Sequence, residues 1–307
     1  GSALAEGYYT LMLSRIGVAC AHSIFWSIAS PLAVRTVPDG RRALALSAIA
    51  TGSSVAMVVG LPLGRVVGLY VGWRMTFLSI AIISALIFVF ILMVFPKLQS
   101  RGKFAFKELP TLLHNRVLLG VFIMSVLFAT AHYTGYSYIE PFLGKVAAMA
   151  PDTVTLVLIV FGGSGMFGSI AFSKYYMSNR RRFMLAVTLG PALCMLLLQA
   201  AATGMAYILA VCILWGAMAT AFNIAFQDNT IRFAPEHATS IAMSIFSGIF
   251  NLGIGSGAYV GGLVVSRLSI EYIGYAGGAI GMIATLYLTL RYFPNMRRRE
   301  AAETKQK

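Results

Sequence analysis

Four polar side chains lie close together near the end of one long apolar segment. His132, Tyr133, Tyr136 and Glu140 fall within an arc of about 100° on an ideal helix, so one face would present an imidazole, two phenols and a carboxylate. Aromatic faces with hydroxyl and carboxylate groups suit a small polyhydroxylated or amphiphilic ligand. Tyrosines at a helix end also form the aromatic belts of membrane interfaces, and this second interpretation stays open, above all for Tyr138.

A second polar stripe occurs in the first apolar segment. Arg15, His22 and Trp26 follow i, i+7, i+11 spacing, which places them on one helical face. A charge at membrane depth costs about 2.5–3.5 kcal/mol on insertion scales, so Arg15 needs a reason to be there. Either it is a fixed positive charge in a central cavity, or its long side chain extends to the nearer membrane surface. His22 is equally compatible with a packed core histidine and with a titrating one.

Side-chain amides form a third candidate group. Asn223 and Gln227 are spaced i, i+4 in the seventh apolar segment, where they either contact a ligand or bond a neighbouring helix. Asp228, next in the chain, is predicted to be an interfacial charge. The candidate substrate-binding residues are therefore His22, Trp26, His132, Tyr133, Tyr136, Glu140, Asn223 and Gln227.

Small residues recur at four-residue spacing in two segments. Such glycines let membrane helices approach closely, and they serve either to pack helices or to form a flexing interface between bundles. Pro62 removes one backbone hydrogen bond and is expected to kink its helix. Asn251 is expected to bond a neighbouring helix. The candidate packing or gating residues are Gly60, Pro62, Gly64, Gly68, Asn251, Gly253, Gly257 and Gly261.

Neither catalysis nor a bound metal is predicted. The sequence holds no phosphate-binding loop, no HExxH motif and no evident pair of nucleophile and base. Cys20, Cys194 and Cys212 lie inside apolar segments without the spacing of metal ligands, so we interpret them as small packing residues. We therefore expect no enzyme activity and no cofactor.

Membrane helices must position all of these residues. Hydrophobic residues make up 58% of the 307, charged residues only 11%, and the mean hydropathy is +0.80. A soluble domain of this length does not need so much apolar surface. Crossing about 30 Å of hydrocarbon takes about 20 residues at about 1.5 Å each. Nine segments qualify: 8–34, 43–64, 73–95, 116–140, 152–175, 183–203, 205–227, 239–264 and 272–293.

The net charge of +14 is distributed unevenly. If alternate loops face opposite sides of the membrane, most Lys and Arg residues fall on one side, which the positive-inside rule makes cytoplasmic. The charge thus describes a multi-pass protein with a cytoplasmic C-terminus, and it argues against a nucleic-acid partner. The rich side collects Arg35, Arg41, Arg42, Lys97, Arg101, Lys103, Lys107, Arg116, Lys174, Arg180, Arg181, Arg182, Arg232, Arg291, Arg297, Arg298, Arg299, Lys305 and Lys307.

The longest polar interval divides the chain into two bundles. Residues 1–96 are predicted to hold three helices, 97–115 a basic cytoplasmic linker, 116–293 a six-helix bundle, and 294–307 a basic cytoplasmic tail.

The two bundles also contain a repeat. Ala43–Gly68 aligns with Ala238–Leu263 at an offset of about 195 residues, and the spaced glycines of the two segments correspond after a shift of about two residues. Parallel repeats of this length are typical of transporters made of two halves. The later half begins near residue 115, and the same offset leads back to roughly 80 residues before Gly1. We therefore expect three further helices encoded upstream. The alternative is a truncated, non-transporting remnant.

Several strings resemble one family of transporters: SRIGVACAHSIFWS, ATGSSVAMVVGLPLGR, GWRMTF, AHYTGYSYIEPF and IFSGIFNLGIGSGAYVGG. Taken together they are similar to the major facilitator superfamily, and within it to the sugar-efflux transporters of the drug:proton antiporter-1 family. The resemblance covers essentially the whole chain, as helices four to twelve of a twelve-helix fold. It implies an all-α membrane protein of the bacterial inner membrane, and we expect a monomer.

The resemblance also implies roles for particular residues. The superfamily's helix-four motif, Leu-x-x-x-Arg-x-x-Gln-Gly, matches at Leu11 and Arg15, whereas Val18 and Ala19 replace the Gln and Gly. In proton-coupled members that arginine is linked to proton translocation, which makes Arg15 the candidate coupling residue. The antiporter motif of helix five matches only loosely at 60–64.

The function implied by this resemblance is proton-driven export of sugars or sugar-like solutes by alternating access. The partners would be a small-molecule substrate, protons and the lipid bilayer. A drug or nucleoside antiporter of the same family is the alternative, and the two differ in whether the cavity is aromatic and apolar or matched to hydroxyl groups.

Overall fold

The chain is described here by a computed structural model that covers residues 1–38, 40–94, 112 and 114–305. Every regular element in these ranges is helical. The helices that concern the site are α1 (Tyr8–Arg35), α2 (Arg42–Tyr70), α3 (Trp73–Val94), α5 (Arg116–Tyr136), α6 (Ile139–Lys145), α7 (Pro151–Gly163), α8 (Gly165–Tyr175), α9 (Arg180–Ala201), α10 (Met205–Phe233), α11 (Thr239–Arg267), α12 (Ile273–Tyr287) and α13 (Phe293–Lys305).

Nine helical stretches of the described chain are long and apolar enough to cross a membrane, one for each predicted segment. Several of them combine shorter elements, among them α5 and α6 within the stretch Arg116–Lys145. Helices α7 and α8 meet at Ser164 within the stretch Pro151–Tyr175, and α12 continues through a π-helical turn at Leu288–Tyr292 into α13. The prediction of an all-α membrane protein is confirmed.

Asparagine side chains cap the starts of α5 and α9, where the first backbone N–H groups lack partners within the helix. The Asn115 side chain accepts hydrogen bonds from the N–H groups of Val117 and Leu118, at 3.1 and 3.4 Å. Asn179 caps α9 in the same way through the N–H of Arg182.

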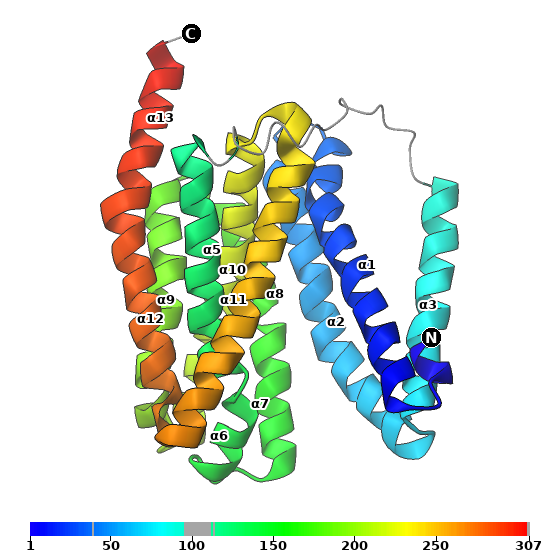
Figure 1. Ribbon diagram of the computed structural model, residues 1–307. Helices are drawn as coiled ribbons and strands as arrows, with labels where there is room; N and C mark the ends of the chain where they lie inside the picture. The colour runs from blue at the N-terminus through cyan, green and yellow to red at the C-terminus, as the bar shows by residue number, and fades with distance from the viewer. Residues whose placement is uncertain (39, 95–111, 113, 306–307) are drawn as a thin grey trace.

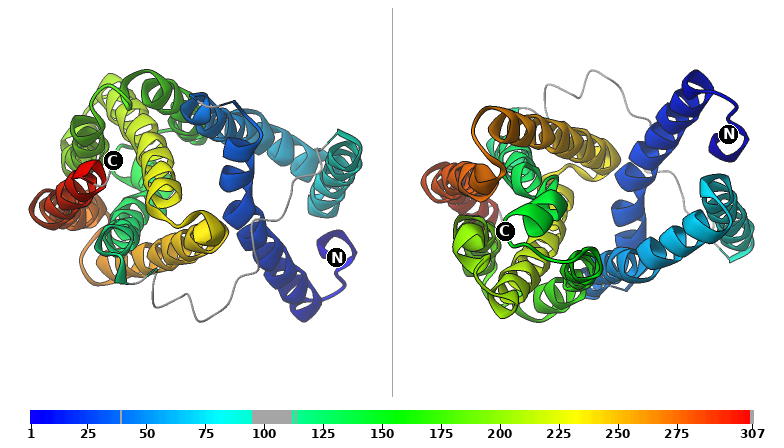
Figure 2. Two further views of the ribbon diagram at one scale, coloured as in Figure 1. Left: turned by 90° about the horizontal axis from the view of Figure 1, so that it is seen from above. Right: turned by 90° about the horizontal axis from the view of Figure 1, so that it is seen from below.

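Two groups of helices stand side by side (Figure 1). Helices α5 and α9 to α12 pack on one another, and α7 and α8 complete this larger bundle against α10. Helix α1 packs on α11, and α2 packs on α7 and α8, while α3 contacts α2 and buries none of its residues. Seen from either end, α3 lies farthest from the larger bundle (Figure 2). Helices α1 and α2 therefore form the interface of the smaller group with the larger bundle.

Glycines allow the closest helix contacts of the larger bundle. A Cβ at Gly253, Gly257 or Gly261 would lie within 3 Å of atoms of α5, so these three glycines permit α11 to approach α5. Gly64 and Gly68 instead face Thr76 of α3, and Gly60 faces open space.

Some predictions fall outside the described residues or differ from the structure. Residues 97–111 and 113 of the predicted linker are outside it, as is the side chain of Pro62. Asn251 does not bond a neighbouring helix: its Nδ2 donates to the Ser247 carbonyl of its own helix at 2.8 Å. The predicted tail is helical as far as Lys305, and Glu300 pairs with Arg181 at 2.8 Å.

Candidate functional site

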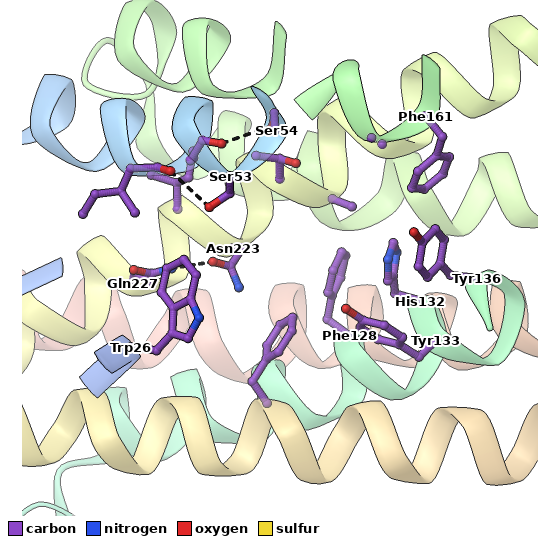
Figure 3. Close-up of a pocket in the computed structure, with 18 of the residues that line it drawn as sticks. Trp26, Ser53, Ser54, Phe128, His132, Tyr133, Tyr136, Phe161, Asn223 and Gln227 are labelled. Atoms are coloured by element: carbon purple, nitrogen blue, oxygen red, sulfur yellow. Dashed lines mark hydrogen bonds between the residues drawn. The ribbon is translucent and has the colours of Figure 1, made fainter. Parts of the chain in front are cut away.

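A cavity of about 240 Å³ lies where α1 and α2 meet α5, α7, α10 and α11. Aromatic side chains line one end and amides the other, with Trp26 of α1 beside the amides (Figure 3). Helix α5 contributes Phe128, His132, Tyr133 and Tyr136. Their i, i+4, i+5, i+8 spacing places all four on one face of a regular helix.

Stacked rings form the aromatic end. The rings of Phe128 and His132 are nearly parallel at a centroid distance of 6.0 Å and an angle of 10°, and His132 and Tyr136 follow at 5.4 Å and 18°. Phe161 of α7 continues the series, with its ring 5.0 Å from Tyr136 at 28°. These rings offer extended flat surfaces against which the C–H face of a small ligand can pack.

A hydrogen bond from a neighbouring helix of the same bundle holds the His132 side chain. The indole Nε1 of Trp215, on α10, donates to His132 Nδ1 at 3.0 Å. Trp215 is fully buried and packs closely on Gly135, where an added Cβ would lie 2.9 Å from the indole ring. The imidazole orientation is thus set by a residue outside the cavity lining.

The amide end joins the two helix groups. Ser30 of α1 donates to Gln227 Oε1, and Gln227 Nε2 donates to Asn223 Oδ1. Both amides are on α10 and one turn apart, so they share a face. Because Ser30 and Gln227 are 197 residues apart in sequence, their contact depends on how α1 packs against the larger bundle.

A second cavity of about 220 Å³ adjoins the first and shares Trp26, Tyr133, Asn223, Gln227 and Phe250 with it. His22 lines this second cavity and accepts a hydrogen bond from Trp26 Nε1 at its Nε2, at 2.8 Å. Asn251 lines it as well.

Uncharged groups dominate both cavities. Within the described part of the chain, no Asp, Glu, Lys or Arg lines either one. Likewise, no group of three or more His, Cys, Asp or Glu side chains in the described residues could hold a metal ion. The surface offered to a ligand combines rings, amides, hydroxyl groups and imidazoles with aliphatic side chains such as Leu46, Ile49 and Ile224.

Seven of the eight candidate binding residues line the two cavities, and Glu140 does not. Glu140 is exposed and lines a separate groove of about 650 Å³ together with Lys145. The predicted common face with His132 fails because α5 ends at Tyr136, and the chain turns at Ser137 before α6 begins. The prediction assumed that one regular helix continues through residue 140, and this assumption was wrong.

Arg15 also lies apart from the cavities. Its side chain is exposed, and its guanidinium carbon is 5.4 Å from the ring centre of Phe77 on α3. Arg15 precedes His22 by seven residues, which at about 1.5 Å per residue is about 10 Å along the helix. Sharing a helical face with His22 therefore does not bring Arg15 to the same cavity.

Asp228, which was predicted to be an interfacial charge, forms a buried ion pair. It is only 5% exposed, and its carboxylate pairs with Nε of Arg42 on α2 at 2.7 Å. The hydroxyl group of Tyr176 donates to the same carboxylate at 3.0 Å. Sequence reasoning missed this ion pair between α2 and α10 because its partners are 186 residues apart.

Similarity to known proteins agrees with this architecture. The profile of the Major Facilitator Superfamily matches residues 1–246 and 178–307. Three relatives from Helicobacter pylori each carry the name "Probable sugar efflux transporter". The proteins of strains J99 and HPAG1 are each 41% identical to this chain, and that of strain P12 is 40% identical. Each alignment spans 288 residues, which is 94% of this chain and 73% of the relative.

Proposed function

Because the chain belongs to the major facilitator superfamily of membrane transporters, we propose that it exports sugars or sugar-like neutral solutes. The observation that carries this proposal is the uncharged cavity between the two helix groups. Stacked rings at one end suit the apolar face of a sugar, and the amides Asn223 and Gln227 suit its hydroxyl groups.

Cavity size supports a small substrate. Ligand pockets commonly measure about 300–1,000 Å³, and the main cavity of about 240 Å³ lies just below that range. The names of the Helicobacter pylori relatives point to the same class of solute. A lipophilic cation would find rings here but no carboxylate among the described lining residues. A sugar fits the lining better than a cationic drug does.

The proposed mechanism is alternating access, in which the two helix groups rock about the cavity. Polar contacts between the groups support it, since they gather near one end of α2. Arg42 pairs with Asp228, and the hydroxyl groups of Thr51 and Ser169 lie 2.6 Å apart. Toward the other end α1 and α2 diverge from the larger bundle (Figure 1). The arrangement corresponds to a transporter closed at the Arg42 end.

Export is proposed to be driven by protons in the bacterial inner membrane. One proton moving inward gains about 2.3 kcal/mol per 100 mV of membrane potential. Since about 1.4 kcal/mol is a factor of ten, this supports a substrate gradient of tenfold or more. Arg15 is the proposed coupling residue, as a fixed cation that would lower the proton affinity of a carboxylate brought beside it during the transport cycle.

Transport by inside-out membrane vesicles tests the proposal. Vesicles containing the protein expressed from its own gene should accumulate radiolabelled arabinose or isopropyl thiogalactoside when an imposed proton gradient drives export. Excess unlabelled sugar should compete, whereas ethidium and uridine should not. Accumulation of ethidium or uridine without any sugar uptake would contradict the proposal of sugar export and support drug or nucleoside export instead.

A pair of tyrosine variants links this activity to the cavity. Tyr136→Phe removes one cavity hydroxyl group and keeps the stacked ring, so sugar uptake should fall about fivefold to tenfold. Tyr259 on α11 is 69% exposed and lines neither cavity, so Tyr259→Phe is the matched control and should transport as wild type. Equal activity of both variants would remove Tyr136 from the binding site.

A further inference from the structure

The hydrogen bond between Trp215 and His132 determines where the imidazole carries its proton. An indole N–H donates and has no lone pair to accept with, so the nitrogen it meets must be unprotonated. Trp215 Nε1 lies 3.0 Å from His132 Nδ1. A neutral imidazole holds one proton, which is therefore on Nε2.

We propose that Trp215 is a positioning residue that fixes His132 as a neutral donor, with its Nε2–H available to an acceptor oxygen of the substrate. The role of the donor rests on the proposed function, since it assumes a ligand rich in hydroxyl oxygens. The position of the proton on His132 is independent of the proposed function, because it follows from the contact with Trp215 alone.

Packing holds both partners of this bond in place. The imidazole is stacked between Phe128 and Tyr136, and the Trp215 ring meets it edge-on at 5.5 Å and 76°. Turning the ring over would exchange Nδ1 for a C–H group and leave the buried indole N–H without an acceptor. Among the described residues, none donates to or accepts from Nε2, while the ring borders the cavity. Nε2 is therefore the nitrogen left for a ligand.

This arrangement disfavours a second proton on His132. An imidazolium would turn the N–H of Nδ1 toward the N–H of Trp215, which breaks a buried hydrogen bond. The titratable rings in contact with His132 are Tyr133 and Tyr136 of its own helix, while α7 and α10 contribute Phe161 and Trp215, which do not ionise. No described carboxylate lines the cavity to stabilise a cation there. His132 thus recognises substrate and does not carry the coupling proton.

Nitrogen NMR on the protein in lipid vesicles tests the proton position directly. With ¹⁵N-labelled histidine, the His132 signals are those lost in His132→Gln. We expect Nδ1 to be unprotonated and Nε2 protonated in the wild type at both pH 7.5 and pH 5.5. A protonated Nδ1 at pH 7.5 would overturn the proposal. The wild-type spectrum is sufficient for this decision, whatever the folding of any variant.

A Trp215→Phe variant then tests whether Trp215 is the cause. Phe keeps the ring but not the N–H, so the neutral tautomer protonated at Nδ1 is no longer excluded, and His132 should show proton occupancy at Nδ1 at pH 7.5 and at pH 5.5. Trp73→Phe is the matched control because Trp73 lies on α3, outside both cavities, and it should leave the His132 signals unchanged. An unprotonated Nδ1 in Trp215→Phe at pH 5.5 would overturn the positioning role.

Sugar binding tests the donor role. His132→Gln keeps a side-chain donor, so it should bind isopropyl thiogalactoside more weakly than wild type but more tightly than His132→Phe. His132→Phe keeps a stacked ring without a donor and should bind about fivefold to tenfold more weakly. Wild-type binding by His132→Phe would overturn the donor role. If the wild type binds no sugar at all, the proposed function and the donor role fail together, while the spectra still decide the position of the proton.

Discussion

The polar side chains of the cavity bond to one another before a ligand enters. Ser30, Gln227 and Asn223 form a chain, and His22 and His132 each accept from a tryptophan. Groups held in this way lose little freedom on binding, which preserves affinity for a small ligand. Each bond also decides which atom remains free to meet the substrate. Residue identity alone is therefore not enough to assign a binding role.

Glu140 provides the sharpest prediction at this scale. Because it is exposed and lines a groove away from the cavity, Glu140→Gln should keep sugar uptake within about twofold of wild type. Asn223→Leu removes an amide that lines both cavities and should lower uptake at least about tenfold. Uptake by vesicles with matched protein levels measures both. A large loss of sugar uptake in Glu140→Gln would show that the Glu140 carboxylate takes part in transport.

Arg15 tests the proton coupling. Arg15→Lys keeps the charge but loses the planar group, so it should retain partial activity, whereas Arg15→Ala should abolish uphill export. Downhill exchange of labelled for unlabelled sugar should survive Arg15→Ala better, since exchange need not complete a proton cycle. Equal loss of both activities would indicate direct substrate contact. Full activity of Arg15→Ala would mean that the side chain merely extends to the membrane surface.

At the scale of elements, the contact between α5 and α11 depends on the absence of side chains. A Cβ at Gly257 would lie 2.5 Å from the carbonyl oxygen of Thr130 and 3.0 Å from the nitrogen of Thr134. Backbone atoms cannot move aside as a flexible side chain can. Since α5 carries the aromatic end of the cavity, a shift of α11 would also displace the stacked rings.

Gly257→Ala should therefore destabilise the protein by about 1–3 kcal/mol, the usual cost of forcing extra volume into a packed contact. Gly255 is the matched control on the same helix, because a Cβ there meets nothing within 4 Å. Gly255→Ala should be neutral or slightly stabilising, as Ala favours a helix over Gly by about 1 kcal/mol. Thermal unfolding in detergent measures both, and equal melting temperatures would contradict the proposed packing.

At the scale of the whole molecule, the joined end of the two helix groups must open during transport. Thr51 on α2 and Ser169 on α8 face each other there at 2.6 Å between hydroxyl oxygens. In a cysteine-free background, the pair Thr51→Cys and Ser169→Cys should form a disulfide that stops transport, and reduction should restore it. Each single variant is a control. Full transport by the oxidised pair would exclude movement at this interface.

Orientation is a second prediction for the whole molecule. A reporter fused at Lys307 should reach the cytoplasm, since the basic loops lie on that side, and one fused near Met149 should reach the outside. Alkaline phosphatase, which is active only outside the cytoplasm, measures this. Its activity at Lys307 would reverse the topology and the proposed direction of transport.

Local properties of the sequence were sufficient to predict the nine membrane-spanning segments and the all-α fold class. Length, apolar content and helical spacing are set by neighbouring residues, and the described chain forms each predicted span. Helical spacing also correctly placed His132 and Tyr136 on one face of their helix. The match to the superfamily rests on the same continuous segments.

Tertiary packing decided which polar groups meet. One turn at Ser137 was enough to separate Glu140 from His132, because a helical period holds only while the helix continues. Arg42 and Asp228 are far apart in the chain, and only the docking of α2 on the larger bundle pairs their charges. The proton on His132 depends likewise on Trp215, a buried residue of another helix. Burial and long-range contact set these outcomes, and neither has a local signature in the sequence.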